Sequence, residues 1–153
     1  MKNQKEPIHI IGIQVRTSNN NNRAAQDIGA MWNKIYQENI GGQVPQKVSS
    51  DLYAVYSHYE SNFKEEYTYT LGYRVSNLDE IPEGLHGNSI EPGNYKTFLA
   101  KGTMPMPIIT AWEEIWELEN KLNRSYQTDY EVYSEKANQG DQSEVPIFIG
   151  INN

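Results

Sequence analysis

An acidic and aromatic run near the C-terminal end of the chain combines residue types that could bind a cation or move a proton. The run is Asp129-Tyr130-Glu131-Val132-Tyr133, and its alternation of acidic with β-branched and aromatic residues is typical of a β-strand. Side chains alternate between the two faces of a strand, so Asp129, Glu131 and Tyr133 share one face.

A carboxylate at the centre of a sheet needs a partner, because withdrawing it from water costs several kcal/mol unless something pairs with it. Three outcomes are open for Glu131. It meets a positively charged ligand, it pairs with a nearby Lys or Arg, or its face of the sheet is solvated.

Composition excludes several other kinds of chemistry. The chain has 153 residues, which suits one domain spanning 1–153. It contains no cysteine, which excludes disulfides, thiol chemistry and cysteine–zinc sites. The net charge of −7 disfavours a nucleic-acid surface, since phosphate contacts need clustered Lys and Arg. We expect no metal and no cofactor, because His58-Tyr59-Glu60 is too common a pattern to indicate a metal site.

Membrane and export signals are not expected in this sequence. No apolar run reaches the length of about 18 residues that a membrane span needs. The N-terminal residues lack the apolar core of a signal peptide, which predicts a cytoplasmic protein.

Hydrophobic periodicity predicts two helices among six strands. Helices are expected over 23–39 and 108–122, with the first stopped by Gly41-Gly42. A Pro- and Gly-rich connector is expected over 77–93 and a polar loop over 136–144. The predicted strands cover 8–17, 51–61, 67–76, 94–101, 126–135 and 145–151.

The order strand, helix, strand, strand occurs twice, over about 8–76 and 94–151. Residues of the first helix recur in the second at one constant offset: Ile28, Trp32, Ile35 and Tyr36 correspond to Ile108, Trp112, Ile115 and Trp116. Such a repeat predicts an α+β fold of duplicated strand–helix–strand–strand modules. Its antiparallel sheet would carry the helices on one face and leave a ligand groove between the halves.

The repeat gives Glu131 a counterpart. Ala54 occupies the equivalent position in the first half, where Val55-Tyr56 corresponds to Val132-Tyr133. Large aromatic side chains at helical spacing pack inward in most proteins, but with a carboxylate they also form a cage for a lipophilic cation. The candidate ligand-binding residues are Glu131, Trp112, Trp116, Tyr133, Tyr56, Trp32 and Tyr36.

The sequence resembles the GyrI-like effector-binding domain, the ligand-binding module of several AraC-type and MerR-type bacterial regulators. The resemblance covers residues 8–151 and is closest to the stand-alone effector-binding proteins encoded by integron cassettes. It implies a groove between the two halves, Glu131 as the acidic centre of the site, and bulky hydrophobic cations as ligands. It is carried by residues 25–32 (AQDIGAMW), 53–56 (YAVY), 72–75 (GYRV), 90–95 (IEPGNY), 111–116 (AWEEIW) and 129–133 (DYEVY).

This resemblance predicts a stand-alone binding protein linked to transcription regulation or drug response. The chain shows no helix-turn-helix region, so we expect no direct DNA binding and a separate regulator protein as the partner for any signal. The alternative is a hydrolase of reactive electrophilic compounds, as in some relatives. Glu131 would then act as general base and Tyr133 or Tyr56 as proton donor.

Overall fold

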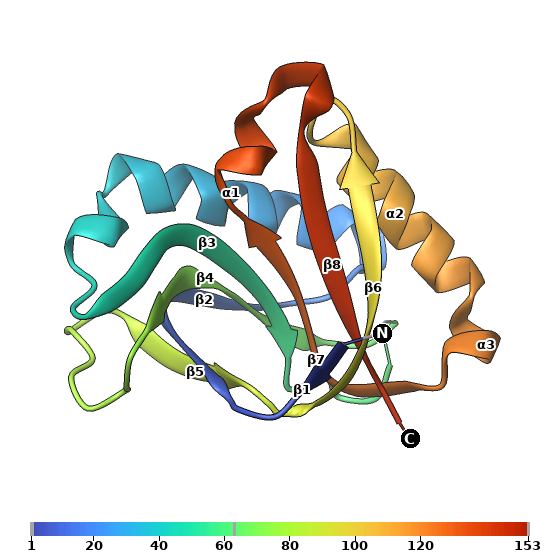
Figure 1. Ribbon diagram of the computed structural model, residues 1–153, viewed down its shortest axis with the longest axis horizontal. Helices are drawn as coiled ribbons and strands as arrows, with labels where there is room; N and C mark the ends of the chain where they lie inside the picture. Colours follow the sequence, from blue (N-terminus) through green and yellow to red (C-terminus); the bar gives the residue numbers. More distant parts are fainter. Residues whose placement is uncertain (1, 63, 153) are drawn as a thin grey trace.

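The computed structural model describes residues 2–62 and 64–152 and shows an α+β fold with one curled antiparallel sheet (Figure 1). The strand order is β1-β6-β8-β7-β3-β4-β2-β5. The helices are α1 (Arg23–Gln37), α2 (Met106–Glu117) and the short α3 (Glu119–Leu122). The strands are β1 (Lys2–Gln4), β2 (Ile8–Thr17), β3 (Lys47–Ser57), β4 (Tyr67–Val75), β5 (His86–Ile90), β6 (Gly93–Lys101), β7 (Arg124–Tyr133) and β8 (Glu144–Ile151).

Two equivalent modules form the sheet, as the sequence repeat predicts. The first is β2-α1-β3-β4 and the second is β6-α2-β7-β8, and they join where β3 pairs with β7. Each module also receives a short edge strand that precedes the other module in the sequence. β1 precedes β2 in sequence but pairs with β6, whereas β5 precedes β6 but pairs with β2. The strand order is therefore symmetric about the β3–β7 pair.

The helices α1 and α2 pack on one face of the sheet, each over its own module. Met31 and Ile35 of α1 belong to a cluster with β2, β3 and β4, and Ile115 of α2 belongs to one with β6 and β8. Side chains of the opposite face, such as Ile10 and Tyr130, are also fully buried. The curl of the sheet explains this burial, because it brings β5 into contact with β7 although three strands separate them in the sheet.

Two strand pairs approach so closely that they require glycine. Gly12 of β2 lies opposite Gly72 of β4, and a Cβ on Gly12 would stand 2.1 Å from the carbonyl oxygen of Leu71. Gly150 of β8 is constrained in the same way, since its Cβ would stand 2.6 Å from the carbonyl oxygen of Thr128. These glycines set the local geometry of the sheet.

Several predicted boundaries are wrong. The first helix ends at Gln37 rather than at Asn39, because Asn39 has a left-handed φ of 47° and the chain turns before Gly41-Gly42. The strand expected over 51–61 begins earlier, at Lys47, and ends at Ser57, because His58 has a left-handed φ of 51°. The second helix begins at Met106 and is interrupted at Leu118.

The two edge strands, β1 and β5, were not predicted from the sequence. The connector expected over 77–93 contains β5 (HGNSI), and the N-terminal segment contains β1 (KNQ). β1 has no β-branched or aromatic residue and β5 has only Ile90, so their pairing with distant strands decides their conformation.

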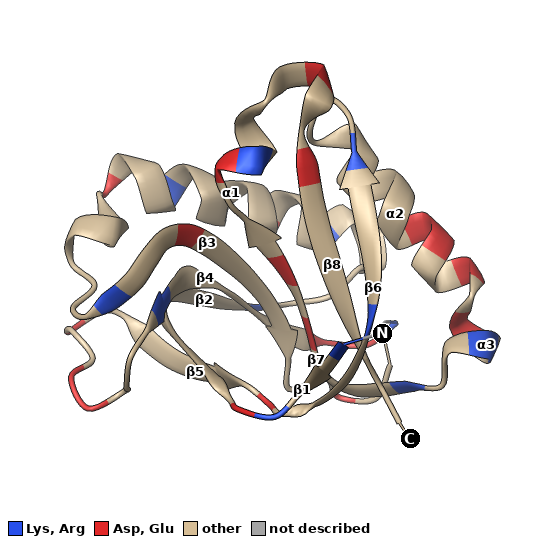
Figure 2. Ribbon diagram, in the orientation of Figure 1, with Lys and Arg blue, Asp and Glu red and all other residues tan. Residues whose placement is uncertain are grey.

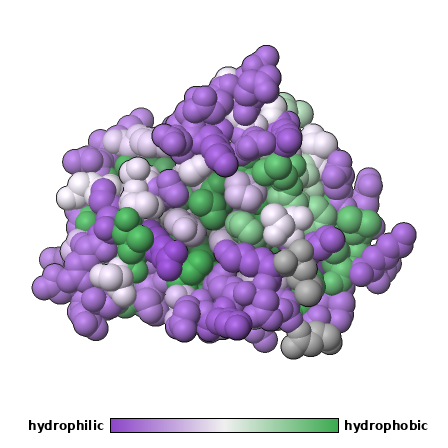
Figure 3. Space-filling view, viewed as in Figure 1, coloured by the Kyte–Doolittle hydropathy of each residue, from purple (hydrophilic) through white to green (hydrophobic). Residues whose placement is uncertain are grey.

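The surface of the molecule is polar on the face shown in Figure 3, where apolar residues appear in patches between hydrophilic ones. None of the helices in the described part of the chain combines the length and apolarity that crossing a bilayer demands.

Candidate ligand-binding site

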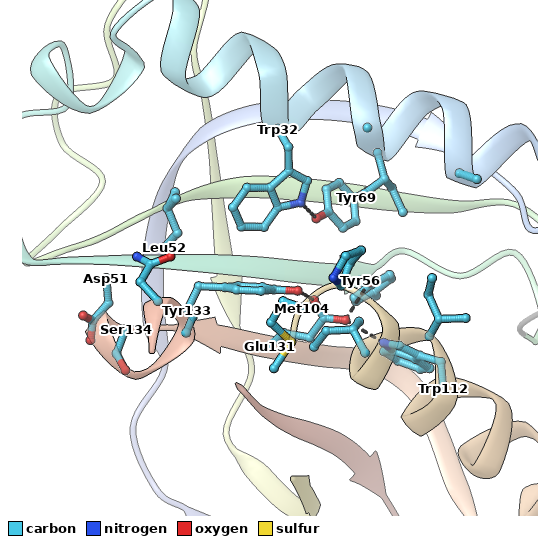
Figure 4. A pocket seen from close by; sticks show the side chains of 18 of the residues that line it. Trp32, Asp51, Leu52, Tyr56, Tyr69, Met104, Trp112, Glu131, Tyr133 and Ser134 are labelled. Carbon is cyan, nitrogen blue, oxygen red and sulfur yellow. Dashed lines mark hydrogen bonds between the residues drawn. The ribbon is translucent and has the colours of Figure 1, made fainter. Parts of the chain in front are cut away.

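A cavity of about 910 Å³ lies between α1 and α2 and is floored by β3, β4 and β7. Figure 4 shows Trp32 projecting from α1 and Trp112 from α2, with Tyr56, Tyr69, Tyr133 and Glu131 between them. The strand face that carries Glu131 points to this cavity, as the alternation along 129–133 predicts. The cavity lies at the junction of the two modules, where a groove between the halves was expected.

Glu131 is buried in the floor of the cavity, with 1% of its surface exposed. Its Oε2 accepts hydrogen bonds from the Tyr56 hydroxyl at 2.9 Å and from the Trp112 indole nitrogen at 2.6 Å. Its Oε1 accepts one from the Tyr133 hydroxyl at 2.6 Å. All three donors are uncharged. Figure 4 marks hydrogen bonds at this carboxylate as dashed lines.

No Lys or Arg within residues 2–62 and 64–152 forms an ion pair with Glu131. The expectation of a basic partner for Glu131 is therefore wrong for the described residues, and the side chain itself is almost inaccessible to solvent. Hydrogen bonds satisfy the lone pairs, but the negative charge itself has no counter-charge among these residues.

Burial raises the pKa of Glu131 above its ordinary value, and the hydrogen bonds from Tyr133, Trp112 and Tyr56 only partly offset that rise. Burial also raises the pKa of Tyr56 and of Tyr133 well above the ordinary value, and the charge of Glu131 adds to both shifts. Both tyrosines therefore remain protonated hydrogen-bond donors at neutral pH. The site is a carboxylate held by neutral donors in an aromatic surrounding.

Aromatic rings surround this carboxylate in contact with one another. The Trp32 and Tyr133 rings meet edge to face at 4.7 Å between centroids, and the Tyr56 and Trp112 rings lie 4.9 Å apart. The Trp32 indole also donates a hydrogen bond of 3.0 Å to the Tyr69 hydroxyl, which fixes its orientation. Ring faces attract cations electrostatically, so these rings and the carboxylate favour the same sign of charge.

The structure brings all seven residues selected from the sequence to this cavity: Glu131, Trp112, Trp116, Tyr133, Tyr56, Trp32 and Tyr36. They lie at different depths, since Glu131 and Trp112 are buried whereas Tyr36 is 65% exposed at the entrance. Sequence reasoning missed three tyrosines of β4 that also line it, Tyr67, Tyr69 and Tyr73. Their even spacing along a strand, two residues and then four, was the signal, because it places all three on one face.

A second carboxylate on the same strand face has a different environment. Asp129 accepts hydrogen bonds from Arg124 Nη2 at 2.6 Å, from the Tyr59 hydroxyl at 2.5 Å and from the backbone nitrogen of Gly150 at 2.8 Å. Both side chains of the Arg124–Asp129 ion pair are at most 1% exposed. The basic partner that was considered for Glu131 therefore belongs to Asp129.

Metal ligands do not gather in the part of the chain that the structure describes. No group of three or more His, Asp or Glu side chains there is arranged to hold an ion. Nothing among these residues links the cavity to metal chemistry.

Known proteins share this sequence and architecture. YobU of Bacillus subtilis (strain 168), named as a candidate transcriptional regulator, is 26% identical over 144 residues, covering 92% of this chain and 89% of its own. The integron cassette protein VCH_CASS2 of Vibrio cholerae has a structure that matches with a TM-score of 0.75 at 25% identity, over 97% of this chain and 93% of that one.

A more distant structure shares the fold alone. SAV2435, solved bound to tetraphenylphosphonium, matches with a TM-score of 0.80 at 17% identity, over 98% of this chain and 92% of its own.

The family assignment rests on nearly the whole chain. The model of the Cass2 family, described as integron-associated effector binding protein, matches residues 3–151. That range includes both modules and every residue of the cavity. The resemblance read from the sequence is thereby confirmed: the chain belongs to the family of integron-associated effector-binding proteins.

Proposed function

We propose that the cavity binds bulky hydrophobic cations and that Glu131 is their counter-ion. The observation that carries this proposal is the environment of Glu131, which is 1% exposed and accepts hydrogen bonds from three uncharged donors. A buried charge without a counter-charge costs free energy, and a ligand cation would recover part of it.

The size and lining of the cavity support the same class of ligand. Its volume of about 910 Å³ falls within the usual range for small-molecule pockets, and aromatic and aliphatic side chains form most of its wall. SAV2435, whose fold this chain shares, is solved with tetraphenylphosphonium, a cation with four phenyl groups. That compound is a suitable first probe.

We further propose that any link to transcription or drug response acts through a separate regulator protein. Lys and Arg are dispersed over the molecule in Figure 2, and acidic residues gather along α2 and α3. With a net charge of −7, such a surface disfavours contacts to a phosphate backbone.

The charge preference of the cavity provides the direct test. We expect tetraphenylphosphonium to bind more tightly than neutral triphenylphosphine oxide or the isosteric anion tetraphenylborate, by at least about tenfold. Titration calorimetry would measure the affinities, and a rise in melting temperature would report binding to the native state. Equal affinity for the cation and the neutral compound at low salt would contradict the proposal.

The pH dependence of binding follows from the buried carboxylate. Because burial raises the pKa of Glu131 above 4.5, protonation begins at a higher pH than for an exposed glutamate. Cation affinity should therefore fall as pH is lowered through that raised value, because the ligand loses its counter-ion.

The empty protein should show the opposite trend. A raised folded-state pKa contributes stability that is complete below the unfolded value and is lost as pH rises through the folded one. Calorimetry from about pH 8 to about pH 5 would test the binding trend, with Glu131→Gln as the control that should show a flat profile. A wild-type profile as flat as that of the variant would contradict the expectation that Glu131 titrates within this pH range.

A further inference from the structure

The two helices present equivalent stripes of residues to the cavity. The sequence repeat relates these stripes at one constant offset, so that each lining position of α1 has a lining counterpart in or just before α2. The lining positions are Ala25, Ile28, Gly29, Trp32 and Tyr36 on the first side and Pro105, Ile108, Ile109, Trp112 and Trp116 on the second. The two walls of the cavity therefore consist of residues at equivalent positions of the repeat.

The two walls differ most in side-chain size at one pair of equivalent positions, Gly29 of α1 and Ile109 of α2. Gly29 is solvent-exposed and Ile109 is 48% exposed, so both lie at the entrance rather than in the floor. The isoleucine narrows its side of the entrance, and the glycine leaves the equivalent side without any side chain.

The fold does not require a glycine at position 29. A Cβ built there meets nothing within 4 Å and the residue lies inside a regular helix, whereas a Cβ on Gly12 would collide with the backbone of β4. Glycine is moreover a poor residue for an exposed helix interior, where alanine gives a more stable helix. Its presence costs stability and provides open space beside the cavity.

We propose that Gly29 sets the upper size limit of the ligand, by leaving room on the α1 side of the entrance for one hydrophobic group of a bulky cation. This inference rests on the proposed function and adds a specificity-determining residue to it. A β-branched side chain at position 29 would occupy that room and reproduce the narrower α2 side.

The experiment compares a large and a small cation on matched variants. Gly29→Ile should weaken tetraphenylphosphonium binding by about tenfold or more, the order expected from overpacking, while changing phenyltrimethylammonium affinity by less than about twofold. Ala30→Ile is the control, since Ala30 is exposed on the same helix but does not line the cavity, and it should leave both affinities unchanged. Gly29→Ala should raise the melting temperature.

A second variant tests whether space at the entrance is the cause. Adding Ile109→Gly to Gly29→Ile moves the opening to the other wall and should restore part of the affinity for tetraphenylphosphonium. Equal weakening of both cations by Gly29→Ile, or no weakening of the large one, would overturn the inference while leaving the proposed function intact. Failure of both cations to bind the unmodified protein would contradict the proposed function and this inference together.

Discussion

Replacement of Glu131 by glutamine should lower the affinity for tetraphenylphosphonium by roughly 2–5 kcal/mol, the usual cost of removing one member of a buried charge pair. Glutamine keeps the shape of the side chain and one acceptor oxygen for the donors of Tyr56, Trp112 and Tyr133. It removes only the charge. Isothermal titration of the variant and the wild type at the same salt concentration would measure the difference.

The same substitution should leave the empty protein as stable as before or more so. Burial raises the pKa of Glu131, which means that the folded protein disfavours the ionised form relative to a neutral one. A neutral amide therefore removes the free-energy cost of burying a charge. Its NH₂ group needs an acceptor, which a tyrosine hydroxyl can provide after rotating its O–H bond away. The melting temperature of the variant would test this expectation.

Glu135→Gln is a matched control for Glu131→Gln. Glu135 also lines the cavity but is exposed, so water screens its charge and the affinity should change little. Loss of stability without loss of affinity in Glu131→Gln would contradict the counter-ion role. If turnover of an electrophilic compound collapsed while binding survived, Glu131 would instead be the general base of a hydrolase, with Tyr133 or Tyr56 as proton donor.

Replacement of Asp129 by asparagine should have the largest effect on stability, lowering the free energy of unfolding by about 3–5 kcal/mol. The change removes the charge that faces Arg124 at 2.6 Å, in a pair whose side chains are at most 1% exposed. The remaining acidic neighbour of Arg124 is Glu119, at the longer distance of 3.7 Å. An arginine left buried in this way has poor compensation for its lost hydration.

Urea-induced unfolding at constant pH would measure this loss, with the double substitution Arg124→Leu and Asp129→Leu as the control. Replacing both charges by apolar groups leaves neither ion uncompensated, so the double variant should recover much of the stability. A single variant that unfolds within about 1 kcal/mol of the wild type would show that the ion pair does not stabilise the fold. We therefore expect different effects from the two carboxylates of this strand face: Glu131→Gln lowers ligand affinity, and Asp129→Asn lowers the free energy of unfolding.

Local patterns in the sequence determined most of the architecture. The alternation along 129–133 placed Glu131 and Tyr133 on one face, and the period of the apolar residues in 23–39 placed Trp32 and Tyr36 toward the cavity. Comparison of the two halves singled out Glu131 against Ala54. These features follow from periods of two and 3.6 residues, which the order of residues alone reveals.

Tertiary structure alone decided which charges meet. Asp129 and Glu131 have the same type of side chain on the same face, yet only Asp129 reaches Arg124, because the irregular pairing of β7 with β8 between Arg124 and Asp129 sets that approach. The exchange of β1 and β5 between the modules is likewise invisible in the sequence, since their partners are distant in the chain.

The register of β3 against β7 also decided the form of the site. Ala54 stands directly opposite Glu131 at the junction of the modules, so the two equivalent positions of the repeat face each other. Side chains opposite each other on paired strands lie about 5 Å apart, and two buried carboxylates at that separation would repel strongly. The second half can therefore carry Glu131 because the first half carries the small neutral Ala54 opposite it. The pairing of β3 with β7, rather than either strand alone, places this pair beneath the cavity.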